Sequence, residues 1–223
     1  MKKISVVKAF DSIAGEWNEK HPAPRAWVPL FKTFLKKKGV LLDAGCGNGV
    51  NSIAFAHLVK KIYAIDASRR MVEFARVNVS SNGLNDKIIV KKASILSLPF
   101  NDSFFDAVAY FAVIHHFAKP REWRKIFSEM RRVLKRGGLA FVTVWNKLKA
   151  EQMEAHAQKT MFVHFTKKTG ERIARMHYFF GERELARLAE ENGFRVKSVF
   201  YERGGKKSDR AKGKNLCLVL RKP

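Results

Sequence analysis

The chain has 223 residues, 46% of them hydrophobic, which suffices for one domain with a full core. Lysine and arginine number 44 against 20 aspartate and glutamate residues, so the formal net charge is +24 at pH 7. A lysine-rich thermophile surface usually carries matching glutamate. The excess of basic residues therefore predicts a polyanionic partner, with nucleic acid favoured over a membrane.

The sequence also limits where the protein is expected to act. No apolar run reaches the roughly 18 residues that a membrane span requires. Lys2 and Lys3 are not followed by an apolar segment, so we expect no signal peptide. The two cysteines, Cys46 and Cys217, indicate a reducing compartment, and we expect a cytoplasmic protein.

Apolar periodicity and turn residues divide the chain into alternating helices and strands. Residues 5–20 and 24–38 are predicted helices, which we assign to an N-terminal lid (1–38) ahead of a main domain (39–223). Strands are predicted at 40–44, 61–66, 87–91, 104–111, 139–145, 194–202 and 215–220, with helices at 52–58, 69–80, 120–136 and 182–192. This order predicts an α/β fold with a doubly wound, mostly parallel seven-stranded sheet and an antiparallel terminal strand.

Two segments interrupt the alternation. Residues 146–180 are polar at first and then rich in aromatic side chains, and we expect a substrate-side insertion there. Residues 203–214, the basic loop, join the last two predicted strands and carry six basic residues among twelve. The basic loop is either a solvated hairpin tip or a contact for an RNA backbone.

The segment after the first predicted strand is typical of a nucleotide pocket. Asp43 lies near the strand's end, and Gly45, Gly47 and Gly49 follow at alternate positions before the next helix. Glycines let a ligand approach the backbone, and a helix N-terminus offers amide groups without helical partners. A dinucleotide fingerprint needs its third glycine one residue later, so the spacing disfavours a dinucleotide cofactor.

Two acids select the ligand. Asp43 lies beside the glycines, where it suits an ammonium group and would repel a pyrophosphate. Asp66 ends the second predicted strand, about 20 residues after the glycines, where an acid pairs with ribose hydroxyls. A ligand with an amino acid at one end and a ribose at the other is S-adenosylmethionine. With these motifs the chain resembles the class I methyltransferases, which have a Rossmann-like fold.

That resemblance implies which residues contact the cofactor. The three glycines would contact its methionine and ribose portions, Asp43 its amino group and Asp66 its ribose. Met71 either covers the adenine or is a core methionine, and Ser94 stands where the family has an aspartate that accepts from the adenine amine. The expected cofactor contacts are Asp43, Gly45, Cys46, Gly47, Asn48, Gly49, Asp66, Ala67, Met71, Ser94, Ile95 and Ala112.

A double histidine, His115 and His116, follows the fourth predicted strand, beside the expected position of the methyl group. Adjacent histidines at a strand end point apart, and no other cysteine or histidine cluster is in register with them. We therefore expect no metal site. The pair is expected to face the substrate, with only one of the two taking part.

The remaining segments resemble one family, the tRNA carboxymethyluridine methyltransferases. The resemblance rests on residues 10–14, 112–117, 161–165 and 175–185, on Trp145 and on Asn215. It implies tRNA as the substrate and an ester formed on a carboxymethyl group of the wobble uridine. It also implies a partner, a small zinc-binding methyltransferase activator subunit that covers an exposed sheet edge.

This chemistry needs no general base, because a carboxylate is already ionised at neutral pH. It needs in-line placement and a dry pocket. We expect Arg25 in the lid and Arg175 in the insertion to hold the carboxylate. His115 or His116 could add a hydrogen bond, and Trp145 could stack on the base or form a wall. Two alternatives stay open: a small-molecule methyltransferase of a quinone- or amine-type pathway, and an RNA-binding module that holds the cofactor without turnover.

Overall fold

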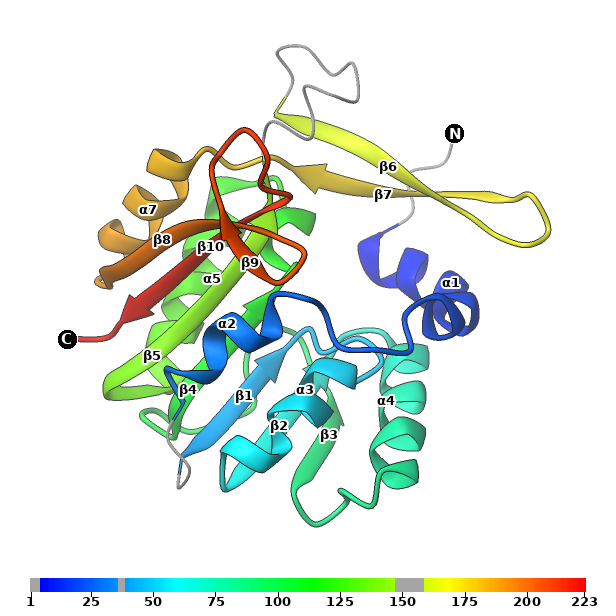
Figure 1. Ribbon diagram of the computed structural model, residues 1–223, viewed down its shortest axis with the longest axis horizontal. Helices are drawn as coiled ribbons and strands as arrows, with labels where there is room; N and C mark the ends of the chain where they lie inside the picture. The colour runs from blue at the N-terminus through cyan, green and yellow to red at the C-terminus, as the bar shows by residue number, and fades with distance from the viewer. Residues whose placement is uncertain (1–4, 36–38, 147–158) are drawn as a thin grey trace.

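A central sheet dominates the computed structural model, which describes residues 5–35, 39–146 and 159–223 (Figure 1). Its strands are β1 (Val40–Ala44), β2 (Lys61–Asp66), β3 (Ile88–Lys92), β4 (Phe105–Phe111), β5 (Leu134–Trp145), β8 (Arg195–Arg203), β9 (Lys206–Ser208) and β10 (Asn215–Arg221). They lie in the order β3-β2-β1-β4-β5-β10-β8-β9. The first five are parallel, and β10 is antiparallel to both of its neighbours. The predicted doubly wound sheet is confirmed, with one short strand more than the seven expected.

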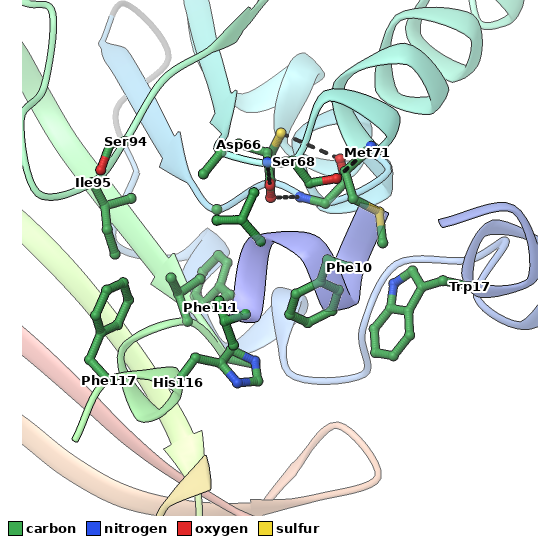
Figure 2. Close-up of a pocket in the computed structure, with 18 of the residues that line it drawn as sticks. Phe10, Trp17, Asp66, Ser68, Met71, Ser94, Ile95, Phe111, His116 and Phe117 are labelled. Atoms are coloured by element: carbon green, nitrogen blue, oxygen red, sulfur yellow. Dashed lines mark hydrogen bonds between the residues drawn. The ribbon is translucent and has the colours of Figure 1, made fainter. Parts of the chain in front are cut away.

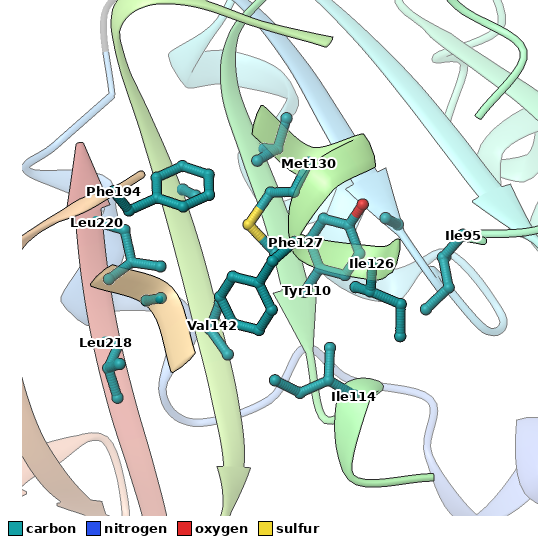
Figure 3. Packing of buried hydrophobic residues seen from close by; sticks show 14 of the residues in the cluster. Ile95, Tyr110, Ile114, Ile126, Phe127, Met130, Val142, Phe194, Leu218 and Leu220 are labelled. Atoms are coloured by element: carbon teal, nitrogen blue, oxygen red, sulfur yellow. The ribbon is translucent and has the colours of Figure 1, made fainter. Parts of the chain in front are cut away.

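Helices cover both faces of this sheet. The helices of the described residues are α1 (Val6–Lys20), which contacts α4 and not a face of the sheet, α2 (Val28–Lys32), α3 (Val50–Phe55), α4 (Arg69–Ser81), α5 (Pro120–Val133) and α7 (Glu182–Glu191), with short 3-10 turns η1 (Ala56–Leu58) and η2 (Ile114–His116). On one face α2, α3 and α4 contribute Phe31, Phe55 and Val79 to a buried cluster. On the other face Phe127 and Met130 of α5 pack over β4, β5 and β10 (Figure 3). In residues 5–35, 39–146 and 159–223, no helix has the length and apolar character needed to cross a bilayer.

The second predicted helix is much shorter than expected. Instead of residues 24–38, α2 covers Val28–Lys32, and residues 36–38 lie outside the described part of the chain. Pro29 occupies the first turn, the only part of a helix where a missing N–H costs nothing. The backbone N–H of Arg25 instead donates to Oδ1 of Asn51 at 3.0 Å, so this stretch is tied to α3 and not to a helix of its own.

The end of α5 and the start of the basic loop also differ from the prediction. Helix α5 ends at Val133 and not at Arg136, because Leu134 already pairs with Phe105 of β4. Strand β9 forms within the basic loop and pairs with the end of β8. Sheet pairing, which local propensity does not encode, decides both boundaries.

The predicted insertion contains a separate hairpin, β6 (Thr160–Thr166) paired with β7 (Arg172–Tyr178), while residues 147–158 lie outside the described part. The hairpin runs across α1 (Figure 1). Phe165 and Ile173 of the hairpin pack with Ala9 and Ile13 of α1 in a third buried cluster. The N-terminal helix and the insertion therefore form one structural unit above the sheet. The division into a lid (1–38) and a main domain (39–223) stays a prediction.

Candidate active site

The turn between β1 and α3 is held in place by the end of β2. The backbone N–H groups of Gly45 and Cys46 both donate to the carbonyl oxygen of Ile65, at 2.8 and 2.9 Å. The N–H of Gly47 donates to Oδ2 of Asp66 at 3.0 Å. The acid predicted to bind ribose therefore also shapes the glycine turn.

Two of the glycines are required by their surroundings. Gly45 and Gly49 have φ angles of +78° and +80°. A Cβ at Gly45 would lie 2.5 Å from a methyl carbon of Val113, and one at Gly49 would lie 3.1 Å from Cβ of Ala75. A Cβ at Gly47 would meet no atom within 4 Å, so its backbone faces open space. The turn thus packs tightly at both ends and leaves room for a ligand in its middle.

A cavity of about 480 Å³ opens in front of this turn (Figure 2). Its size is within the range of roughly 300–1,000 Å³ that is usual for small-molecule sites. Among the predicted site residues, those that line it are Arg25, Gly45, Cys46, Gly47, Asn48, Asp66, Ala67, Met71, Ser94, Ile95, Ala112 and His116. Segments far apart in the sequence therefore meet at one site, at the carboxyl edge of the parallel strands.

Asp66 has the geometry expected of a ribose-binding acid. Its Oδ1 accepts from the N–H of Ser68 at 2.8 Å and its Oδ2 from the N–H of Gly47 at 3.0 Å. Burial raises the pKa of Asp66, whereas these two bonds lower it. Each oxygen retains lone-pair capacity toward the cavity, which suits acceptance from two hydroxyl groups.

Asp43 does not line the cavity. It is only 1% exposed, and the hydroxyl of Ser52 donates to its Oδ2 at 2.5 Å. Burial raises its pKa to about 6. In the structure Asp43 stabilises the first turn of α3 through its hydrogen bond with Ser52. Its contact with the cofactor's amino group stays a prediction. Gly49, His115, Trp145 and Arg175 also lie outside the lining of the cavity.

The N-terminal helix closes the cavity from the solvent side. Asp11 of α1 accepts from the hydroxyl of Ser68 at 2.6 Å, and Asn18 accepts from the side-chain amide of Asn48 at 2.9 Å. Phe10 and Trp17 of the same helix line the cavity (Figure 2). The sequence analysis missed these two rings as site residues. Their spacing of seven, which places both on one helical face, is the signal that could have found them.

The loop after β3 carries Ser94 and is anchored by α5. The hydroxyl of Ser94 accepts from the N–H of Leu96 at 3.2 Å. Further along, the carboxylate of Glu129 accepts from the N–H of Leu98 at 2.7 Å, while Arg132 donates to the carbonyl of Leu98 at 2.9 Å. The hydrogen bond from Arg132 lowers the pKa of Glu129 to about 2, so this anchor stays charged. The wall assigned to adenine is therefore rigidly supported.

Strand β4 ends in an unusual conformation beside the cavity. Ala112 has a φ of +57°, and its N–H donates to the carbonyl and hydroxyl oxygens of Thr143, both at 3.0 Å. Left-handed backbone at a residue other than glycine is costly, and it concentrates at functional sites. The chain then enters η2, which brings His116 to the cavity and leaves His115 behind it.

The histidine rings do not point apart, and this expectation is wrong. The ring centroids of His115 and His116 are 4.5 Å apart. His177 of β7 joins them, with its centroid 4.7 Å from that of His115 and 4.5 Å from that of His116. Trp145 packs on His177 at 4.3 Å. Burial lowers the pKa of His116 to about 4, so its imidazole is neutral at pH 7.

Arg25 and Arg175 converge on one ring from two segments. Their guanidinium carbons lie 5.4 and 5.1 Å from the ring centroid of Trp17. Arg175 is only 6% exposed, and its Nε has no hydrogen-bond partner among the described residues. Burial, followed by the charge of Arg25, lowers the pKa of Arg175 to about 10, so both groups are cationic at pH 7. Among the described residues neither guanidinium forms an ion pair, and of the two only Arg25 lines the cavity.

These features define a class of enzyme. The family model described as "Methyltransferase domain" matches residues 42–142, which run from β1 into β5. The left-handed glycine turn, the acid at the end of β2 and the open face at Gly47 fit S-adenosylmethionine, which is the cofactor. The chain is an S-adenosylmethionine-dependent methyltransferase with the Rossmann-like fold of class I.

Among its relatives is the tRNA (carboxymethyluridine(34)-5-O)-methyltransferase alkbh8 of Xenopus tropicalis, 32% identical over 147 residues. That match covers 65% of this chain and 22% of the frog protein, so the chain spans less than a quarter of its relative's length. A SAM-dependent methyltransferase from Methanosarcina mazei has a similar fold, with a TM-score of 0.71 and 23% identity over 87% of this chain and 97% of its own. A chain in the complex between the Haloferax volcanii Trm112 methyltransferase activator and a methyltransferase has a TM-score of 0.72 and 16% identity, with full coverage of both chains.

We expect Asp66→Ala to weaken S-adenosylmethionine binding, because the variant lacks the acceptor for two ribose hydroxyls. Removal of a charge-assisted bond costs roughly 1.5–3 kcal/mol, about tenfold or more in Kd. Isothermal titration calorimetry measures the change, and circular dichroism checks the fold of the variant. Exposed Asp86, changed to alanine, is the control. Equal affinity in the two variants would mean that the ribose site is assigned wrongly.

Proposed function

We propose that this methyltransferase acts on tRNA and forms an ester on a carboxymethyl group of the wobble uridine. The observation that carries the proposal is the pair Arg25 and Arg175, both held against Trp17. A carboxylate needs a cation to orient it and no base to activate it. The similarity to the Xenopus tropicalis enzyme supports the same substrate.

The aromatic surroundings of the two arginines suit this reaction. The guanidinium carbon of Arg175 also lies 5.5 Å from the ring of Phe10 and 6.0 Å from that of Phe165. Bound S-adenosylmethionine supplies a methyl group on a positively charged sulfur, and transfer to a carboxylate oxygen cancels both charges. A dry pocket favours a reaction that neutralises charge, since water stabilises the charged ground state most. Arg25 lines the cavity and is proposed to contact the carboxylate, with Arg175 behind it.

The remaining predicted catalytic residues divide into two roles under this proposal. His116 lines the cavity as a neutral imidazole whose Nδ1 lies 3.0 Å from the carbonyl oxygen of Met176, so its Nε2 can accept one hydrogen bond at the substrate. His115 and Trp145 lie behind it and would support the wall. The double histidine would therefore contribute one substrate contact, from His116.

The basic loop supports RNA as the carrier of the carboxylate. Its lysines and arginines at 203, 206, 207, 210, 212 and 214 are all exposed. Gly205, at the tip of the β8–β9 hairpin, packs on the carbonyl of Ala26, next to Arg25. The basic loop therefore lies next to the segment that carries Arg25. Its lysines and arginines could bind the phosphates of an RNA whose modified base occupies the site.

A small activator subunit is part of the proposal. The methyltransferase fold in the Haloferax volcanii complex with Trm112 supports such a partner. Strand β3 ends the sheet in the described part of the chain and offers an edge for it. A cytoplasmic location stays a prediction.

We expect the chain, with and without a Trm112-type protein, to transfer labelled methyl groups to tRNA that carries carboxymethyluridine. The product is an ester, so mild base should release the label as methanol. Nucleoside mass spectrometry locates the modified base, and tRNA with unmodified uridine is the control. Label that resists mild base would indicate methylation on nitrogen or carbon. Transfer to small quinones or amines, with none to tRNA, would favour the small-molecule alternative.

We expect Arg25→Met and Arg175→Met each to lower kcat/KM for the tRNA about tenfold or more, with little change in cofactor affinity. The reason is the removal of a charge-assisted interaction, worth roughly 1.5–3 kcal/mol. Steady-state kinetics and calorimetry separate the two effects. Arg172→Met is the matched control, an exposed arginine on the same strand as Arg175. Normal kinetics in both variants would remove the arginine pair from the mechanism.

We expect tRNA affinity to fall steeply with salt, and the basic loop to supply part of that dependence. Changing Lys206, Arg210 and Lys214 to alanine should reduce the slope of log affinity against log salt by about 0.7–0.9 for each phosphate that is no longer neutralised. Filter binding at several salt concentrations measures the slope. Arg195, Lys197 and Arg221, exposed at the opposite ends of β8 and β10, form an equal-charge control set. Equal slopes for both triple variants would make the basic loop a solvated tip.

A further inference from the structure

Three histidines meet at the joint between the insertion hairpin and the sheet. His115 and His116 belong to η2, and His177 comes from β7. One ring nitrogen from each lies within 4.8 Å of the other two. All three side chains are buried, at 1%, 8% and 1% exposure. Histidine is intermediate among the residue types in how often it is buried. Three buried histidine side chains with their ring nitrogens this close together are a candidate metal site.

The donor set determines which ions fit. Imidazole nitrogens suit zinc, copper, nickel and cobalt, whereas magnesium and calcium prefer oxygen ligands. Histidine binds a metal through a ring nitrogen that carries no proton. No acidic side chain belongs to the cluster in the described part of the chain. The set therefore consists of three imidazole nitrogens.

His116 also has the outer partner that metal-binding histidines usually have. Its Nδ1 lies 3.0 Å from the carbonyl oxygen of Met176. A carbonyl only accepts, so the proton of the neutral ring is on Nδ1 and the lone pair is on Nε2. This arrangement fixes the tautomer and directs one nitrogen toward a ligand.

We propose that His115, His116 and His177 bind one divalent transition-metal ion of the zinc type. Zinc–nitrogen bonds of about 2.0–2.1 Å place two ligands of a tetrahedral ion roughly 3.3 Å apart. The three nitrogens must therefore draw together, and the His115 and His177 rings, stacked at 19°, must turn. Rotation about χ2 of histidine is soft, so small movements suffice.

The ion would connect two parts of the structure that sequence keeps far apart. It would tie β7, which carries Arg175, to η2, which carries the cavity residue His116. Three protein ligands leave a fourth position open. Arg175 lies two residues before His177 on β7, and a positive charge in this region favours an anion at that position over a neutral ligand. The proposal does not depend on the identity of the methyl acceptor, but with the ion bound Nε2 of His116 is a metal ligand and is not available as the substrate contact.

Metal titration of the untagged full chain tests this proposal. After chelator treatment, Co²⁺ added to the protein should give visible absorption typical of a nitrogen-ligated ion, and Zn²⁺ should abolish it by competition. Elemental analysis should then find one zinc per chain. His177→Phe keeps a ring in the cluster and removes its nitrogens, so it should bind roughly 100-fold or more weakly. Exposed His57, changed to alanine, is the control and should bind as the wild type does.

A second measurement on the wild type needs no variant. In ¹⁵N spectra of the histidine rings, stoichiometric Zn²⁺ should shift the signals of His115, His116 and His177 and leave that of His57 unchanged. Shifts confined to other histidines would overturn the proposal. Substoichiometric binding by the wild type, or equal affinity in wild type and His177→Phe, would do the same and would make the cluster a packing contact.

Discussion

The carboxylate of Asp66 is the constraint on which the site depends. It accepts from the backbone of the glycine turn at Gly47 and from that of the α4 cap at Ser68. Ser68 in turn donates to Asp11 of α1. One carboxylate thus fixes the turn that faces the ligand, the start of the following helix and, through one more bond, the helix that closes the cavity. Burial raises its pKa, and these backbone bonds are what keep a carboxylate in such a place.

The second constraint is the joint between the N-terminal helix and the insertion. Apolar contacts among Ile13, Phe165 and Ile173 hold the hairpin on α1. Arg175 is buried within this joint against aromatic rings, and the charge of Arg25 acts on it. A buried cation without an acid costs free energy, so a fold that keeps Arg175 buried and Arg25 partly buried near a cavity is suited to an anion. The same joint brings His177 to the double histidine.

The surface of the protein also carries an excess of positive charge. The chain has 44 basic and 20 acidic residues. The basic loop lies beside the segment that carries Arg25, because Gly205 packs against Ala26. A diffuse positive field attracts a polyanion from a distance, while Arg25 and Arg175 act only within the site. In the proposed substrate, the RNA backbone thus matches the basic surface, and the carboxylate matches the pair Arg25 and Arg175.

Sequence alone determined the alternation of strands and helices, the antiparallel last strand, and the glycine turn with Asp66, because periodicity, caps and glycine spacing are local signals. It missed the length of α2, the end of α5 and strand β9, where pairing or a distant side chain overrides local propensity. It also predicted ligand contacts for Asp43 and Arg175, neither of which lines the cavity, and these roles stay predictions. The meeting of His177 with His115 and His116, and of Phe10 and Trp17 with Arg175, was decided only by the tertiary structure. Such contacts join segments about 60 to 165 residues apart, and a chain's local pattern holds no information about which distant side chains its fold brings together.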